Sequence, residues 1–363
     1  MELNNKSIEK LKELGLQMVE QLKKKEDPSI GIPIRTLSNV YYDEAKELLM
    51  LGNSKSQRNY LNISNTKKFM QTMMVGAFCK ELLKSNVTTS IRDLYYSLKG
   101  TIAGTNENTF NEQEESDPVI EDIEVAMELL REQINLKANR KGYMVGNCII
   151  KDAGDMIDLT KLGSGGYGIP SNVEPNIIEF KKIDADFILM VEKAAVWERL
   201  NEDKFWKKYN CVLMTGEGQP SRGVRRMLHR LCYETKIPIY CLVDNDPWGI
   251  YIHSVIKQGS INLAFMSSEL GVPKAKFIGI SSYDMEKFKI SKNVEIKMTD
   301  ADIKRCKELL NYKWFKSKEW QKEINHMIDT KRKLEIEALS NKGIKFISDE
   351  YLPAKIDNKD WLD

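Results

Sequence analysis

Histidine is scarce in this chain, and cysteine never occurs in the paired spacing of a zinc or redox motif. The three histidines lie far apart along the 363 residues, and the six cysteines are scattered singly among mostly apolar neighbours. Structural zinc sites need four such ligands, usually in closely spaced pairs, so we do not expect one here. The single cysteines are interpreted as reduced core residues of a cytosolic protein.

Long apolar runs and an excess of one charge are also missing. No apolar run reaches about 18 residues, and residues 7–26 alternate charged and apolar side chains at helical spacing. We therefore expect neither secretion nor a membrane span. Lysine and arginine number 55 against 53 acidic residues, a formal charge of only +2. Nucleic-acid binding must therefore be argued from local patches, such as the basic excess within residues 181–230.

The usual phosphate-binding loops for nucleotides are not found either. Residues 163–168 match Gly-x-Gly-x-x-Gly, but Ile169 and Pro170 follow where a dinucleotide site needs a helix. The segment TGEGQP at residues 215–220 offers backbone N–H groups to an anion, yet it lacks the lysine and hydroxyl residue of a P-loop. If ATP is needed for function, we expect another chain to bind it.

The residues that are present indicate a globular chain with two different patterns of secondary structure. Its length predicts two or three domains, and 42% hydrophobic with 30% charged residues is a globular composition. Residues 1–65 are interpreted as a helical arm and a small β region. Residues 66–162 read as three helices and a β-like stretch, an order that fits a winged helix-turn-helix. Residues 163–180, rich in Gly, Pro, Ser and Asn, are interpreted as a linker.

Beyond this linker, residues 181–363 alternate short apolar strands with helices and end in a mainly helical extension. Alternating buried strands and helices predict a parallel sheet covered on both faces. The predicted fold class is therefore α/β, in a multidomain α+β chain. It consists of a CAP-like winged-helix DNA-binding domain followed by a Rossmann-like parallel-sheet domain.

Carboxylates follow two strands of this predicted sheet. Glu192 closes the strand FILMV, and Asp244 and Asp246 follow the strand IPIYCLV. Ligands of open α/β sheets collect at the carboxyl ends of the strands, and converging carboxylates favour a hard cation such as Mg²⁺. Spacing alone supports equally well a turn with helix-capping aspartates.

A second candidate is the segment RDLYY at residues 92–96. A free tyrosine phenol is ionised to only about one part in a thousand at neutral pH, so a nucleophilic tyrosine needs a nearby cation or base. Arg92 lies one helical turn before Tyr96, on the same face. Taken alone, adjacent tyrosines in a helix are more often packing residues.

A third candidate is a run of arginines in the helix that begins at Ser221. They recur every three or four residues, which fits either a phosphate-contacting stripe or a solvated helix face. The arginines concerned are Arg222, Arg225, Arg226 and Arg230.

Six segments, in this order along most of the chain, resemble the A-subunit family of type IIB topoisomerases, which includes the meiotic double-strand-break proteins. Each segment is weakly specific alone, whereas their common order is highly specific. The segments are SIRDLYY (90–96), IPSNVE (169–174), ADFILMVEK (185–193), TGEGQP (215–220), LVDNDPWG (242–249) and YLPAKI (351–356).

The resemblance implies a winged-helix domain joined to a toprim domain, with Tyr96 as nucleophile and Glu192, Asp244 and Asp246 as the Mg²⁺ site. It also implies a homodimer that cuts both strands of double-stranded DNA through 5′-phosphotyrosyl bonds. ATP is bound by a separate GHKL-type B subunit in an A2B2 heterotetramer. We expect a cytoplasmic, nucleoid-associated protein of archaeal type. Glu217 and Ser221 depart from the family pattern, which expects a lysine and an acidic residue there.

Three alternatives follow from the same residues. A break-forming relative cleaves DNA without efficient religation. A toprim nuclease uses a metal-activated water and forms no covalent bond to DNA. A noncatalytic winged-helix protein only binds DNA, and it needs none of the three carboxylates.

Overall fold

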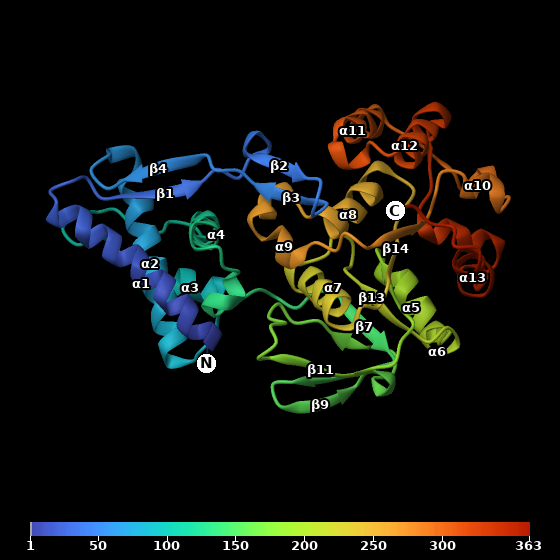
Figure 1. Ribbon diagram of the computed structural model, residues 1–363, viewed down its shortest axis with the longest axis horizontal. Coiled ribbons are helices and arrows are strands. Elements are labelled where there is room, and N and C mark those ends of the chain that lie inside the picture. The colour runs from blue at the N-terminus through green and yellow to red at the C-terminus, as the bar shows by residue number, and fades with distance from the viewer. Residues whose placement is uncertain (1) are drawn as a thin grey trace. The chain divides into compact units, whose positions relative to one another are not determined.

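The chain passes from one folded unit to another between Asn139 and Arg140 in the computed structural model, which describes residues 2–363 (Figure 1). The first unit consists of the residues up to Tyr41 together with residues 50–139 and 261–266. The second unit consists of residues 42–49, 140–260 and 267–363. Each unit has its own buried apolar clusters.

The first unit is mainly helical. One cluster packs α1 and α2 against α3 and α4, with Val75, Leu94 and Ile120 fully buried. Two small strand pairs complete the unit, β1 with β4 antiparallel and β5 with β6 parallel. The bounds are α1 Glu2–Lys23, β1 Ser29–Pro33, β4 Lys55–Asn59, α2 Ile63–Ser85, β5 Thr89–Ser90, α3 Ile91–Leu98, α4 Ser116–Met127 and β6 Leu136–Lys137.

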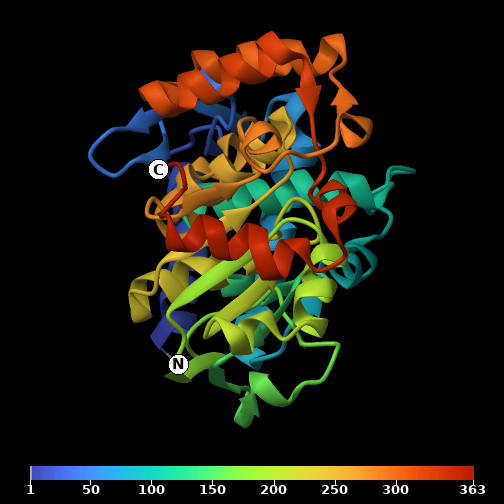
Figure 2. The same cartoon turned by 90° about the vertical axis from the view of Figure 1, so that its right-hand side faces the viewer.

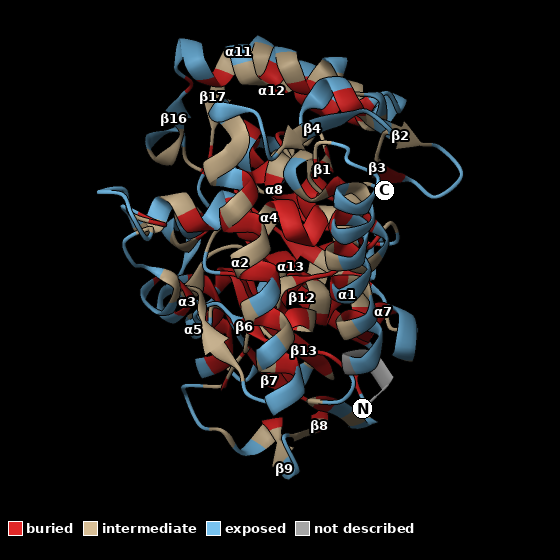
Figure 3. Cartoon of the chain, turned by 90° about the vertical axis from the view of Figure 1, so that its left-hand side faces the viewer, coloured by how far each residue is buried: buried red, intermediate tan, exposed pale blue. Residues whose placement is uncertain are grey.

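The second unit contains a six-stranded sheet in the order β10-β7-β13-β12-β14-β15. The four strands from β13 to β15 in this order are parallel, as the alternating pattern predicts. Their bounds are β12 Phe187–Val191, β13 Cys211–Thr215, β14 Ile239–Leu242 and β15 Lys276–Gly279. The central strands β12 and β13 are buried along their whole length (Figure 3).

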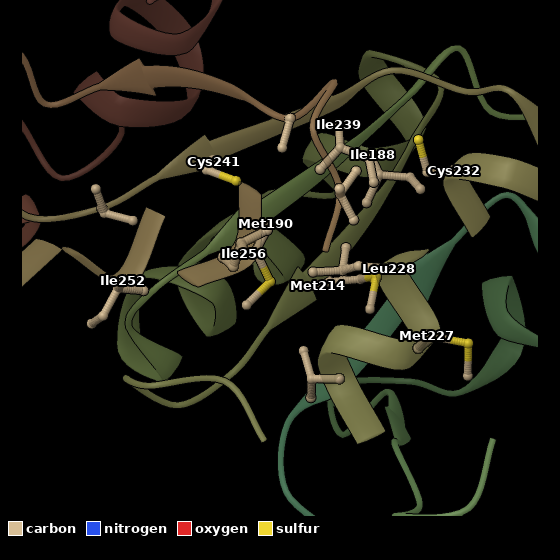
Figure 4. Packing of buried hydrophobic residues seen from close by; sticks show 14 of the residues in the cluster. Ile188, Met190, Met214, Met227, Leu228, Cys232, Ile239, Cys241, Ile252 and Ile256 are labelled. Carbon is tan, nitrogen blue, oxygen red and sulfur yellow. The ribbon is translucent and has the colours of Figure 1, made fainter. Parts of the chain in front are cut away.

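Helices cover both faces of this sheet. On one face, Ile188 and Met190 pack with Met227 and Leu228 of α7 and with residues of α8 (Figure 4). On the other face, the alternate residues of β12 pack with α5 and α13, the latter drawn in red (Figure 2). Successive side chains of a strand point to opposite faces, so a fully apolar strand supplies both cores. The helices are α5 Ala194–Glu202, α6 Phe205–Lys208, α7 Arg222–Thr235, α8 Pro247–Gln258 and α13 Leu352–Asp357.

The remaining elements of this unit are short or lie late in the chain. The helical extension from Thr299 onward is present as α11 and α12, which pack on each other before α13. Strands β2 Val40–Asp43 and β3 Leu48–Leu51 belong to this unit only in part, because residues 40–41 and 50–51 fall in the first unit. The other bounds are α9 Ser267–Leu270, α10 Asp284–Lys287, β16 Ile296–Lys297, α11 Asp300–Asn311, α12 Lys318–Thr330 and β17 Arg332–Lys333. No helix among residues 2–363 has both the length and the apolar character needed to cross a bilayer.

The β-like stretch after the three helices differs from its predicted place. Strand β7 (Tyr143–Gly146) pairs antiparallel with β13, so it extends the parallel sheet of the second unit. The next strands form a separate sheet in the order β11-β8-β9, and the predicted linker 163–180 contains β10 and the start of β11. The bounds are β8 Cys148–Asp152, β9 Asp155–Asp158, β10 Tyr167–Gly168 and β11 Ile178–Ile183. The division between the units therefore precedes the predicted boundary near residue 163.

One core residue of the second unit gives it a pH-dependent stability. His253 of α8 is buried, stacks on Trp320 at 5.7 Å and meets Phe277 edge-on at 5.6 Å. Neither ring nitrogen has a hydrogen-bond partner among the described residues. Burial lowers the pKa of His253 to about 3, so the ring is neutral in the folded chain.

We expect His253→Phe to remove a loss of stability at mildly acidic pH. A histidine in the unfolded chain titrates near ~6.5. The stability contributed by the neutral ring is therefore complete above about pH 6.5, and it is lost as pH falls toward the folded value, because the unfolded chain takes up the proton first. Through this residue, unfolding should become easier by about 2 kcal/mol at about pH 5.

Urea unfolding followed by tryptophan fluorescence, at neutral pH and near pH 5, measures this difference. The native chain should lose about 2 kcal/mol more than the variant between the two conditions. Equal losses in both proteins would show that His253 is not the group that titrates.

Candidate active site

Helix α3 places two adjacent tyrosines in different surroundings. The helix begins after Ser90 because a reciprocal cap joins Ser90 to Asp93, with 3.0 Å from Asp93 N to Ser90 Oγ. Tyr95 is buried, and its hydroxyl donates to the carbonyl of Asn111 at 2.9 Å. Tyr96 is 59% exposed. Of the pair, Tyr96 is the residue that a substrate can reach.

Two cations accompany these tyrosines. The guanidinium carbon of Arg92 lies 5.9 Å from the centre of the Tyr96 ring, as their spacing predicts. The amine of Lys99 donates to the Tyr95 hydroxyl at 2.9 Å. This hydrogen bond to Tyr95 raises the pKa of Lys99. Sequence reasoning missed Lys99, although its spacing of four residues from Tyr95 was available as a signal.

The predicted carboxylates lie at the carboxyl edge of neighbouring strands. Val191, the last residue of β12, pairs with Leu242, the last residue of β14. Glu192 follows directly, and its carboxylate oxygen Oε2 accepts a hydrogen bond from the backbone N–H of Asp244 at 3.0 Å. Parallel pairing therefore brings together residues that are 52 positions apart.

Asp244 is held by two groups that the sequence did not indicate. Its Oδ1 accepts from the backbone N–H of Ile336 at 2.9 Å, and its Oδ2 lies 3.1 Å from the amine of Lys193. The same amine also pairs with Glu335 at 3.4 Å and Glu337 at 3.1 Å. Although burial opposes it, the carboxylates of Asp244 and Glu337 raise the pKa of Lys193. Lys193 thus links the edge to the segment after β17.

Asp246 begins helix α8. Its Oδ1 accepts from the backbone N–H of Gly249 at 2.7 Å, and Pro247 occupies the first turn, where a proline is well tolerated. A side chain at Gly249 would not fit, because its Cβ would lie 2.3 Å from the carbonyl oxygen of Asp244. This close approach keeps the start of α8 next to Asp244.

The three carboxylates act on one another electrostatically. Burial raises the pKa of Glu192 to about 7, and the charges of Asp244 and Asp246 add to the rise. Burial also raises the pKa of Asp244. Within residues 2–363, no lysine, arginine or histidine lies within ion-pairing distance of Glu192 or Asp246. Lys193 partly offsets the charge of this set by pairing with Asp244, and an added cation would relieve the repulsion that remains.

Oxygen donors with a net negative charge fit a hard cation such as Mg²⁺. Each of Glu192 and Asp246 engages one carboxylate oxygen in a hydrogen bond to backbone. Across residues 2–363, no three such side chains already converge closely enough to enclose a metal ion. The chain provides a small acidic set at the edge of the sheet, not a preformed cage.

The loop after β13 also contacts Glu192. The backbone N–H of Gly218 donates to the carbonyl of Glu192 at 2.8 Å. Glu217, where the family pattern expects a lysine, accepts from the backbone N–H of Gly142 at 2.8 Å through its Oε2. In this chain, Glu217 therefore fastens the loop to the segment that leads into β7.

Glu217→Ala should loosen this connection. This hydrogen bond is partly buried, and loss of its acceptor is expected to cost about 0.5 to 1.5 kcal/mol of stability. Glu217→Gln keeps an acceptor oxygen and should retain most of the stability. Hydrogen exchange at the Gly142 amide, together with denaturant unfolding, measures both effects. Unchanged exchange in the alanine variant would contradict the role assigned to Glu217.

The arginines of α7 do not form the solvent-facing stripe that their spacing suggested. Arg225 and Arg230 are each only 3% exposed. Arg226 pairs with Glu174 at 2.9 Å and with Glu269. The predicted phosphate-contacting stripe is therefore wrong for Arg225, which is buried, and Arg226 already pairs with carboxylates, whereas a DNA contact of Arg222 stays a prediction. Periodicity identifies a helix face but does not show what covers it.

Three family models match successive parts of the chain. Residues 67–136 match "Type IIB DNA topoisomerase", and residues 141–184 match "All-beta domain in DNA topoisomerase VI alpha subunit". Residues 187–356 match the toprim domain of the topoisomerase 6 A subunit and Spo11. The second match covers β7 to β11, which the sequence reasoning had divided between a wing and a linker.

Curated relatives match the chain over nearly its whole length. It is 45% identical to the A subunit of type 2 DNA topoisomerase 6 from Saccharolobus shibatae, with 99% of the chain and 97% of the relative covered. The protein of the same name from Hyperthermus butylicus is 44% identical, with 100% and 97% covered. The A subunit of DNA topoisomerase 6 from Arabidopsis thaliana is 36% identical, with 92% and 76% covered.

Proposed function

The chain belongs to the family of topoisomerase 6 A subunits and Spo11 proteins and has the function of a catalytic A subunit of a type IIB DNA topoisomerase, and we propose that Tyr96 is its nucleophile. The resemblance inferred from the sequence is thereby confirmed. The observation that carries the proposal for Tyr96 is the contrast within α3. Tyr95 is buried and hydrogen-bonded, whereas Tyr96 is 59% exposed beside Arg92.

The proposed reaction exchanges one phosphodiester for another. The phenol oxygen of Tyr96 attacks a phosphorus of DNA in line, the bond from phosphorus to the 3′ oxygen breaks, and a 5′-phosphotyrosyl bond forms. The phenol loses its proton, and the departing 3′ oxygen takes one up. Arg92 stabilises the negative charge that develops during this exchange. Because the bond types on both sides are alike, the reverse reaction reseals the strand without an external energy source.

The proposed Mg²⁺ ligands are Glu192, Asp244 and Asp246. When bound, the ion supplies positive charge at the scissile or neighbouring phosphate. The support for this set is its position at the carboxyl edge of the sheet and the mutual repulsion of the three groups. Lys193 and the backbone N–H of Ile336 orient Asp244, and the N–H of Asp244 orients Glu192.

The proposed assembly is an A2B2 heterotetramer on double-stranded DNA, at the nucleoid of an archaeal cell. The relatives are named by a subunit letter, which implies at least one further kind of subunit. We propose that this partner is a GHKL-type ATPase that binds the ATP used for strand passage. Two copies of this chain then cut the two strands of one duplex. In this proposal, α2 to α4 belong to a winged-helix domain that presents Tyr96 to DNA.

Denaturing electrophoresis of end-labelled duplex DNA tests the reaction. The chain is incubated with its B partner, Mg²⁺ and a nonhydrolysable ATP analogue, and protein covalently bound to DNA is then detected. Adducts at 5′ ends that reverse on removal of Mg²⁺ are expected. Cleaved DNA with free 5′ phosphates would indicate a nuclease instead, and adducts that never reverse would indicate a break-forming relative.

A further inference from the structure

A pocket of about 810 Å³ lies within the second unit, at the carboxyl-terminal ends of α7 and α8. The proposed metal ligand Asp246 begins α8 at its opposite end, so the pocket is separate from the carboxylate edge. The segment between α11 and α12 and the turn between β2 and β3 complete its walls. Its size is that of pockets that bind small molecules.

Positive charge gathers around this pocket. Five lysines line it, against the acidic side chains of Glu47 and Asp363. Among the lysines, Lys257 is buried, and its amine donates only to the backbone carbonyls of Pro273 and Ala275. Within residues 2–363, Lys257 has no carboxylate at ion-pairing distance. The carboxylates of Asp363 and Glu47 act on Lys257 only from beyond that distance. A buried cation without a directly paired anion is costly, and lysines outnumber acids around the pocket, so it favours a negatively charged ligand. The lysines are Lys236, Lys257, Lys274, Lys276 and Lys313.

Aromatic rings form another part of the lining. The Trp314 ring lies 6.0 Å from that of Tyr42 and is stacked on Tyr312 at 4.5 Å. Tyr233 and Trp320 also line the pocket. Tryptophan and tyrosine faces are the surfaces on which nucleobases stack. The ligand that fits is therefore both anionic and planar.

Unpartnered polar groups also line the pocket. Gln258 is only 4% exposed, and its Oε1 is buried without a hydrogen-bond partner. The indole N–H of Trp314 is likewise buried without one. Buried polar groups are nearly always hydrogen-bonded, so these two groups are available to hydrogen-bond a polar ligand in the cavity.

We propose that this pocket binds a nucleotide, with its phosphates among the lysines, its base against the aromatic wall and its polar edge on Gln258. A free nucleotide and the terminal nucleotide of a nucleic-acid strand share this chemistry. The pocket is far too small for a folded macromolecule. Such a site would give this chain a nucleotide-responsive surface of its own, distinct from the ATPase proposed for the B subunit.

Isothermal titration of the full chain alone with ADP tests the proposal. We expect saturable one-to-one binding in the micromolar to submillimolar range. The double variant Lys274→Ala, Lys313→Ala removes two exposed lining lysines and should weaken binding at least tenfold. Lys307→Ala, Lys318→Ala is the matched control, because it removes two exposed lysines of α11 and α12 that do not line the pocket. Gln258→Leu should weaken ADP more than pyrophosphate.

Further ligands separate the parts of the assignment. Adenosine and pyrophosphate should each bind more weakly than ADP. If pyrophosphate bound as tightly as ADP, the proposed stacking of the base on the aromatic side chains would be wrong. A 5′-phosphorylated oligonucleotide that binds more tightly than ADP, with the same response to the variants, would identify a strand end as the ligand. No saturable ADP binding at millimolar concentration, or equal weakening by the control variant, would overturn the proposal. Tyr96→Phe should leave ADP binding unchanged, so the test is independent of the cleavage proposal.

Discussion

Tyr96→Phe is expected to eliminate the covalent protein–DNA adduct while leaving the fold intact. The substitution removes one oxygen from a side chain that is 59% exposed and makes no hydrogen bond among the described residues. Packing therefore changes little, but no oxygen remains to attack phosphorus. Removal of a nucleophile from an assembled site lowers rates by about four orders of magnitude or more. Quantitative detection of adducts on labelled DNA measures the loss, and a filter-binding assay should show unchanged noncovalent DNA binding.

The neighbouring tyrosine provides the matched control. Tyr95→Phe removes the same atom one position earlier in α3, where the hydroxyl donates to Asn111 and accepts from Lys99. This variant should lose about 1 kcal/mol of stability and keep most adduct formation. If Tyr96→Phe still formed adducts and Tyr95→Phe did not, the nucleophile would be Tyr95 and the exposure argument would be wrong.

The sequence was sufficient where chain order and periodicity determine position. The apolar strands ending at Val191 and Leu242 had to be buried and parallel, so Glu192 and Asp244 could be placed at one edge from the pattern alone. The four-residue spacing of Arg92 and Tyr96 on a capped helix likewise determined their proximity. Local rules are reliable when a residue and its neighbour belong to one element or to paired strands.

Contacts between segments that are distant in the chain could not be predicted from the sequence. The N–H of Ile336 contacts Asp244 although the two residues are 92 positions apart. From the same segment, the carboxylates of Glu335 and Glu337 pair with Lys193. No local pattern in the sequence indicates these contacts. The same reason explains the arginines of α7. Their spacing resembled a basic surface, but Glu174 and Glu269 come from other parts of the unit to pair with Arg226.

The β stretch after the three helices shows a further limit. A wing and a strand added to a larger sheet have similar sequences, because both are short and partly apolar. Pairing decides between them, and β7 pairs with β13 in a register that places Gly146 beside Val212. A Cβ at Gly146 would lie 2.3 Å from the carbonyl oxygen of Cys211. Only the folded partner strand reveals this requirement.

The second large effect is expected from Asp246→Asn, which distinguishes a metal ligand from a helix cap. Asparagine caps helices about as well as aspartate, so the hydrogen bond from the N–H of Gly249 is kept. The substitution nevertheless removes a negative charge from the acidic edge. If Asp246 only caps α8, cleavage should be unchanged. If it binds Mg²⁺, several kcal/mol of charge stabilisation are lost, and cleavage should fall by about a hundredfold to a thousandfold.

Titration of cleavage with Mg²⁺, alongside thermal unfolding, separates the two roles of Asp246. For Asp246→Asn, the Mg²⁺ concentration at half-maximal cleavage should rise steeply while the melting temperature changes little. Asp246→Ala should lose the cap as well, and should therefore lower stability by about 1 kcal/mol in addition to the cleavage defect. Full activity of the asparagine variant at the native Mg²⁺ requirement would remove Asp246 from the metal site. The acidic edge would then consist of Glu192 and Asp244, with Asp246 serving only to begin α8.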